Sequence, residues 1–238
     1  MRTVLILPLT LLAAPAMAGT FTPPEGCKAY LTVQSRGCLV SHFYTCEKDA
    51  AGDQWRADYD DQGPFFLSRI DREAQWLESY DSNPTVKETM DPNPKDPASF
   101  QTLLDTGLDT FTFSLTKESG EHTNITGFDK LTGKTVVIDG VTLQQTEYEY
   151  TQTMDDGTVL RHAKGNEFIS AEWRTFFSGH SEWEGEDGTW TPVEGAPVSF
   201  MLPGDPGFDS TTPLFECNAT MSSLALPHSV MPAAFPSP

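Results

Sequence analysis

The chain has 238 residues, with 15 lysines and arginines against 34 aspartates and glutamates, so its formal net charge is −19 at pH 7. Contacts to phosphate dominate binding to nucleic acids and to anionic membrane surfaces, and such contacts need lysine and arginine. We therefore expect no nucleic-acid partner for this protein.

The first 18 residues have the pattern of a cleavable secretory signal. Arg2 precedes an apolar stretch, Val4–Ala14, which is followed by Ala16-Met17-Ala18. A positive start, a short apolar core and a small-residue cleavage site are typical of signal peptides, and the core is shorter than the roughly 20 residues that span a bilayer. We expect residues 1–18 to be removed, leaving a soluble bacterial protein, periplasmic or secreted, with no integral membrane segment in the mature chain.

The cysteines lie after this signal, at Cys27, Cys38, Cys46 and Cys217. An even number in an exported protein favours two disulfides. Residues 27–35 and 38–46 have strand patterns, and a two-residue turn, Arg36-Gly37, can join them. Cys27 then faces Cys46, so we predict the pairs Cys27–Cys46 and Cys38–Cys217. The spacing lacks the close cysteine pairs of zinc sites, so no metal site is expected.

Alternating apolar residues, separated by turns rich in Asp, Gly and Pro, predict a series of further strands. These strands are expected at 54–59, 65–71, 74–80, 85–90, 110–116, 121–127, 135–138, 141–154, 158–164, 167–177, 189–193 and 198–201. Asp139-Gly140 is a strong signal for a tight hairpin between two of them.

One short helix is predicted after a proline-rich stretch. Asp96 can cap its start before Pro97, an apolar stripe runs from Phe100 to Leu104, and Gly107 can end it. The pattern predicts an all-β, mainly antiparallel fold: a curved sheet, half-barrel or barrel of successive hairpins with one helix packed on it. We expect a single domain at residues 19–225 and a disordered, proline-rich tail at 226–238.

No residue pattern predicts catalysis, a metal or a cofactor. Ser181 follows Gly179 at the right spacing but lacks the second glycine of a nucleophile elbow, where Trp183 stands. Asp58 and Asp60 resemble the start of a calcium loop, but Arg69 stands where that loop needs glutamate. Glu167 and Glu172 could form an acid–base pair, yet they fall on opposite faces of the predicted strand.

Tryptophans offer a weaker signal for binding. Trp55, Trp76 and Trp173 lie within strand patterns and are expected in the core. Trp183 and Trp190 lie in acidic, loop-like surroundings and are candidates for a binding surface. The sequence favours a non-catalytic envelope protein that binds a small apolar ligand or a partner protein. The alternative is a hydrolase of envelope or extracellular polysaccharide whose carboxylates come from distant strands.

Overall fold

The computed structural model describes residues 19–82 and 85–217. The predicted signal, residues 1–18, and the predicted tail, 226–238, lie outside them. The elements are β1 (Cys27–Ser35), β2 (Leu39–Cys46), β3 (Gln54–Asp60), β4 (Gly63–Ile70), β5 (Trp76–Ser82), β6 (Thr85–Met90), α1 (Phe100–Thr106), β7 (Leu108–Lys117), β8 (His122–Ile138), β9 (Val141–Met154), β10 (Val159–Ser170), β11 (Thr175–Glu184), β12 (Trp190–Glu194) and β13 (Pro197–Met201).

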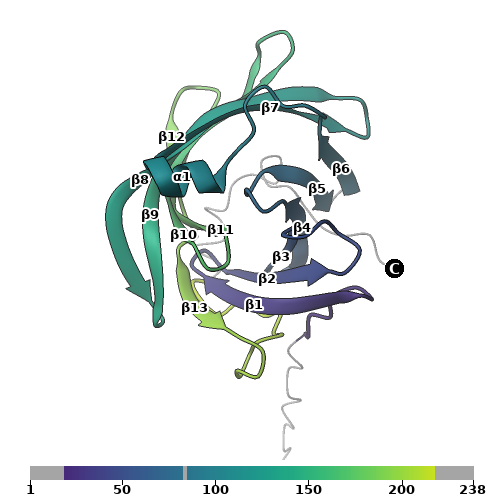
Figure 1. The fold of residues 1–238 in the computed structure, drawn as a ribbon, viewed down its shortest axis with the longest axis vertical. Coiled ribbons are helices and arrows are strands. Elements are labelled where there is room, and N and C mark those ends of the chain that lie inside the picture. The colour runs from purple at the N-terminus through teal and green to yellow at the C-terminus, as the bar shows by residue number, and fades with distance from the viewer. Residues whose placement is uncertain (1–18, 83–84, 218–238) are drawn as a thin grey trace, which may run out of the picture.

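All the strands belong to one 13-stranded sheet, in the order β12-β11-β10-β9-β8-β7-β6-β5-β4-β3-β2-β1-β13. Strands that follow one another in the chain are antiparallel neighbours from β1 to β12, as expected for a series of hairpins. The sheet curves strongly, so that β1 and β2 lie across the interior from β7 (Figure 1). The prediction of an all-β, curved sheet with one short helix packed on it is confirmed.

The predicted tight turn between β8 and β9 is present. Asp139 and Gly140 have φ angles of 49° and 79°, the left-handed conformation that a two-residue turn of this kind requires. β9 has the predicted bounds, whereas β8 is one continuous strand from His122 to Ile138 that joins the two predicted segments 121–127 and 135–138.

The first hairpin differs from the prediction near its turn. Cys27 does face Cys46, but the register shifts by one between Ala29 and Leu31, so Ser35 pairs with Leu39. The connection therefore has three residues, Arg36–Cys38, rather than two. Gly37 and Cys38 have left-handed φ angles of 74° and 61°. These two residues reverse the direction of the chain in the three-residue turn.

The predicted single strand at 167–177 is wrong. β10 ends at Ser170, a turn occupies residues 171–174, and β11 begins at Thr175. The turn contains no glycine or proline, and Arg174 supplies the left-handed conformation with a φ of 48°. Apolar and polar residues alternate through the turn, just as buried and more exposed residues alternate along β11, so the sequence pattern does not mark where the strands end.

Helix α1 begins three residues later than predicted. Ser99, not Asp96, is the N-cap, and its side chain accepts a hydrogen bond from the amide of Thr102. Asp96 instead forms a β-bridge with Thr112. Gly107 ends the helix as predicted, with a φ of 82°. Seven residues cannot hold a helix in water alone, so α1 depends on burying Phe100 and Leu103.

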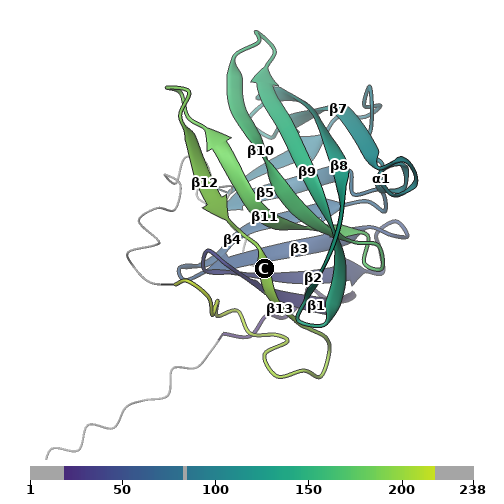
Figure 2. The ribbon, with the colours of Figure 1, turned by 90° about the vertical axis from the view of Figure 1, so that its left-hand side faces the viewer.

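Two links connect opposite parts of the curved sheet. β12 and β13 follow one another in the chain but lie at opposite edges, joined through Gly195 and Ala196 (Figure 2). The amide of Gly195 donates to the carbonyl of Gly179, and the amide of Arg36 donates to the carbonyl of Ala196. The β10–β11 turn also crosses the interior, where Gln54 Nε2 donates to the carbonyls of Trp173 and Arg174.

Two disulfides join Cys27 to Cys46 and Cys38 to Cys217, the same pairs that the hairpin pattern predicts. Persistent disulfides fit a protein that matures in an oxidising compartment outside the cytoplasm. Within residues 19–82 and 85–217, no helix has the length and apolar character needed to cross a membrane.

Candidate functional site

A row of polar side chains crosses the inner face of the sheet. Asp109 on β7 pairs with Asp129 on β8, which pairs with Tyr148 on β9; the row continues through Gly165 on β10 to Ser181 on β11. Residues directly opposite on neighbouring strands point to the same face. Five consecutive strands, β7–β11, therefore present these residues to one region of the interior.

Gly165 determines how the row is connected. A Cβ atom at this position would lie 2.4 Å from the carbonyl oxygen of His180 and 2.6 Å from Cα of Ser181, so β11 leaves no room for a side chain. Because β10 contributes no side chain here, Tyr148 reaches over it, and its hydroxyl donates a hydrogen bond of 3.0 Å to Ser181 Oγ. Ser181, which the sequence pattern does not support as a nucleophile, is thus a buried hydrogen-bond acceptor for Tyr148.

The next row on the same face contains Leu131, Thr146 and Glu167, since Leu131 pairs with Thr146 and Thr146 with Glu167. Glu167 consequently lies diagonally across from Asp129. Both carboxylates keep part of their surface open to solvent. Glu172, the partner considered for Glu167 from the sequence, lies exposed in the β10–β11 turn, so the structure replaces it with Asp129.

The acidic side chains of this face hold their protons unusually tightly. Burial raises the pKa of Glu167 to about 7, although the positive charge of Arg56 opposes the shift. Burial, followed by the negative charges of Glu167 and Asp109, raises the pKa of Asp129 well above its ordinary value. Burial also raises the pKa of Asp109 to about 6, against a hydrogen bond from the amide of Ser99. Such shifts are common where carboxylates act in binding or catalysis.

In the described part of the chain, the side chains of Asp129, Thr146 and Glu167 lack hydrogen-bond partners. Thr146 is fully buried, and its hydroxyl oxygen has no partner. Among the hydrogen bonds of the described residues, none reaches the carboxylate of Asp129 or Glu167. Buried polar groups are normally paired, so an unpaired hydroxyl opposite an unpaired carboxylate marks an unusual place in the fold.

Aromatic rings line the inner face beside the carboxylates. Tyr150 lies 5.9 Å from Trp76 and 6.2 Å from Trp183, centroid to centroid, and Trp76 lies 5.5 Å from Phe113. The core position predicted for Trp76 is wrong, because 41% of this residue is exposed. Trp55 and Trp173 are half-buried. An exposed tryptophan among other rings leaves an apolar surface open to solvent.

The two tryptophans considered for binding occupy opposite faces. Trp183 belongs to the inner aromatic group, with the guanidinium of Arg161 4.9 Å from its ring centre. Trp190 lies on the outer face, where Lys164 Nζ is 3.7 Å from its ring centre and His162 packs against its edge. Trp183 is therefore next to the carboxylates, whereas Trp190 is not.

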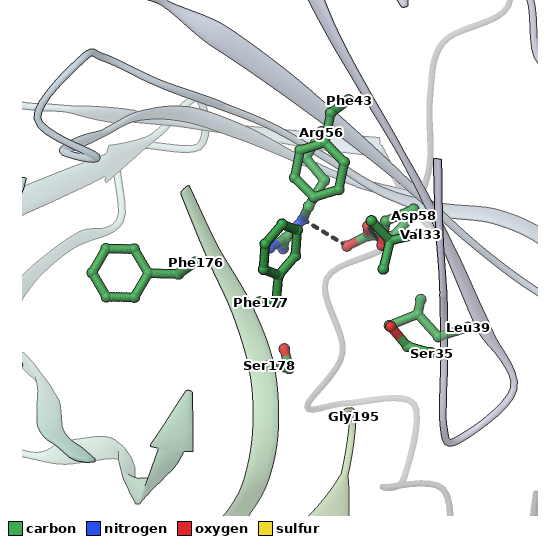
Figure 3. A pocket seen from close by; sticks show the side chains of 11 residues that line it. Val33, Ser35, Leu39, Phe43, Arg56, Asp58, Phe176, Phe177, Ser178 and Gly195 are labelled. Carbon is green, nitrogen blue, oxygen red and sulfur yellow. Dashed lines mark hydrogen bonds and ion pairs between the residues drawn. The ribbon is translucent and has the colours of Figure 1, made fainter. Parts of the chain in front are cut away.

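A small cavity lies between β11 and the strands β1–β3 (Figure 3). Its volume is about 40 Å³, and a neighbouring cavity near Trp55 measures about 30 Å³. Arg56 and Asp58 line the first with their charged groups 3.1 Å apart, and Ser41 Oγ donates 2.6 Å to Asp58. Sites for drug-sized ligands are roughly 300–1,000 Å³, so these cavities have room for a few water molecules.

No family model matches the chain, and neither does any curated protein. Among solved structures, the chain is similar to a protein from Bacteroides fragilis NCTC 9343 that is inferred to be exported and is described as having a YmcC-like fold. The two share 13% identity and a TM-score of 0.38, over 77% of this chain and 99% of the other. A likeness at this level carries no inference about this chain.

Proposed function

We propose that this is an exported, non-catalytic protein of the cell envelope that binds a partner protein through the inner face of its sheet. The observation that carries the proposal is the aromatic surface around Trp76, which is 41% exposed beside Phe113 and Tyr150. Tryptophan and tyrosine are the residues most often responsible for affinity in protein interfaces. A single open aromatic surface on a concave face is suited to an inserted side chain or segment.

A partner protein fits this surface better than an enclosed apolar ligand does. The cavities of about 40 and 30 Å³ are too small for an acyl chain, and the larger one is lined by Arg56 and Asp58. A ligand would therefore have to lie on the inner face rather than inside a closed pocket. The signal-like residues 1–18 and the two disulfides support a location in the periplasm or outside the cell.

Photo-crosslinking tests the proposal. A benzoylphenylalanine placed at Trp76 in the native host should give one discrete adduct with an envelope protein after irradiation, identified by mass spectrometry. The same probe at Lys130, an exposed position on β8, serves as the matched control and should give no such adduct. Adducts of equal yield at both positions, or an adduct with lipid at Trp76, would contradict a protein partner on the inner face.

A carboxylate-dependent hydrolase of polysaccharide is the second candidate, favoured by the raised pKa of both Asp129 and Glu167. A glycosidase needs one carboxyl group protonated near neutral pH and another ionised. This candidate predicts that the purified protein releases reducing ends from peptidoglycan or exopolysaccharide, and that Glu167→Gln lowers the rate at least about 100-fold. Equal rates in the wild type and Glu167→Gln would rule the carboxylate pair out.

A further inference from the structure

The carboxylates of Asp129 and Glu167 and the hydroxyl of Thr146 form an oxygen-lined group on the inner face. Thr146 pairs directly with Glu167 on β10, and Asp129 pairs with Tyr148, two residues along the same strand β9. Side chains at these positions share one face, with Cβ atoms of direct partners about 5 Å apart. Three oxygen-bearing groups from three adjacent strands therefore lie in two adjoining rows of the same face.

We propose that this group binds an ammonium ion, namely the lysine side chain of a partner protein. The inference rests on the proposed function, since it states which chemistry the inner face recognises. An ammonium group has three N–H donors and no acceptor, which matches the acceptor oxygens of two ionised carboxylates and one hydroxyl. Guanidinium is planar and prefers both oxygens of one carboxylate, so it matches a diagonal arrangement less well.

The buried hydroxyl of Thr146 is independent support for a ligand. It is fully buried, has no hydrogen-bond partner, and lies directly opposite Glu167. Leaving a buried hydroxyl unpaired is unfavourable, whereas valine has nearly the same shape and no such cost. A donor that arrives with a ligand would satisfy this oxygen together with the carboxylates.

Among the described residues, no lysine or arginine forms an ion pair with Asp129, and none forms one with Glu167. Arg56 acts on Glu167, but its guanidinium ion-pairs with Asp58 at 3.1 Å and lies over the ring of Phe66 at 5.3 Å. Arg161 lies over Trp183 instead. A metal ion is a poorer match, because no group of three histidine, cysteine or carboxylate side chains among the described residues is arranged to hold one.

The neighbouring rings suit the rest of a lysine side chain. Tyr148 stacks on Tyr150 with ring centres 6.2 Å apart, and Tyr148 belongs to the same row as Asp129. A lysine stem can lie along aromatic surface while its charged end reaches an acceptor, and an ammonium ion is itself attracted to aromatic faces. The exposed Trp76 lies on the same aromatic surface, which connects the ammonium position to the surface proposed for the partner.

Titration of the full mature chain with a blocked pentapeptide, acetyl-Ala-Ala-Lys-Ala-Ala-amide, tests the site at pH 7.5 by NMR. Saturable shifts at Thr146 and Tyr148 are expected, whereas the same peptide with norleucine in place of lysine should cause none. Glu167→Gln and Thr146→Val should each weaken binding about tenfold or more, as expected for hydrogen bonds to a charged group. Both variants keep the shape of the side chain and should fold.

Glu147→Gln is the matched control, because Glu147 lies on β9 between Thr146 and Tyr148 but points to the outer face, toward Lys130. It should leave binding unchanged. An equal loss in Glu147→Gln would mean that the acidic protein attracts cations without a site, and no binding by the wild type would overturn the proposal. If 1,6-diaminohexane binds more tightly than the peptide, the site recognises a free polyamine, and the proposal of a lysine side chain from a partner protein is overturned.

The two proposals can fail separately. A protein adduct at Trp76 without any binding of the lysine peptide would leave the partner surface standing and remove the ammonium site. Binding of the lysine peptide without a protein adduct at Trp76 would leave the ammonium site standing and remove the partner surface.

Discussion

Replacing Cys38 and Cys217 together by serine should lower the free energy of unfolding by about 5 kcal/mol, the largest effect of any change considered for this chain. The bond closes a loop across a sequence separation of 179 residues, and the entropy that a cross-link removes from the unfolded chain grows with the length of the loop. Urea unfolding followed by tryptophan fluorescence measures the effect directly.

The same bond also anchors a segment that completes the core. Gln34 is fully buried on β1, and its side-chain amide is satisfied by the backbone of that segment: Nε2 donates to the carbonyl of Thr212, and Oε1 accepts from the amide of Leu214. When Cys217 is free, this segment can detach and leave Gln34 unpaired. Amide hydrogen exchange in the second half of β1 should therefore accelerate in the double variant.

The Cys27→Ser/Cys46→Ser variant is the internal control. Its sequence separation is 19 residues, which corresponds to about 3 kcal/mol in the same entropy model. It joins residues that already pair in the β1–β2 hairpin. A larger loss from this variant than from Cys38→Ser/Cys217→Ser would contradict the argument from loop length and from the anchored segment.

The second large effect concerns pH. The protein should be more stable at pH 5 than at pH 8, and Glu167→Gln should remove a large part of the difference. The pKa of Glu167 is about 7 in the folded protein against an ordinary 4.5, so between these values the folded state keeps a proton that the unfolded state has lost. The free energy of unfolding then falls as pH rises through this window, by about 3 kcal/mol.

Asp109 and His122 act in the same direction, whereas His42 acts against them, because burial lowers its pKa to about 4. The pKa of Asp109 is raised to about 6, with the same sign. Hydrogen bonding to Asp155 raises the pKa of His122. For a histidine of this kind, the stabilisation is present below its ordinary pKa and is lost as pH rises through the folded pKa.

Denaturation midpoints at pH 5, 6, 7 and 8 test the pH dependence. Glu167→Gln should match the wild type near pH 4 and exceed it at pH 8, because glutamine cannot ionise in this buried position. Glu147→Gln, on the outer face of β9, should keep the pH slope of the wild type. Parallel slopes for the wild type and Glu167→Gln would show that Glu167 does not hold its proton in the folded state.

Local sequence patterns predicted the hairpins well where a turn signal was present. β6 has the predicted bounds, and the Asp139-Gly140 turn is where the sequence places it. The register shift in β1 could not be predicted, because every residue from Leu31 to Ser35 is buried and alternation then no longer distinguishes the two faces. The β10–β11 turn was missed because Arg174 adopts a left-handed conformation that no local residue type announces.

The candidate site was beyond the reach of sequence reasoning. Asp129, Thr146 and Glu167 come from three strands, and their convergence depends on the register of two ladders, β8–β9 and β9–β10. The sequence singles out Glu167, but with Glu172 as its partner. Asp129 follows a phenylalanine in a strand of mixed residues, a pattern equally common on solvated surfaces, so its burial could be found only from the assembled sheet.

The pairing of β1 with β13 has a consequence for how the chain folds. Every other pair in the sheet joins strands that are neighbours in sequence, and such local contacts form rapidly. β1 emerges first, yet Thr32 must wait for Met201 to pair, so one edge of the growing sheet stays unprotected until almost the whole chain is available. An unpaired edge is where strands from different molecules aggregate. A chaperone that covers β1 during synthesis would therefore raise the yield of folded protein, and truncation before β13 should yield aggregates rather than a smaller folded sheet.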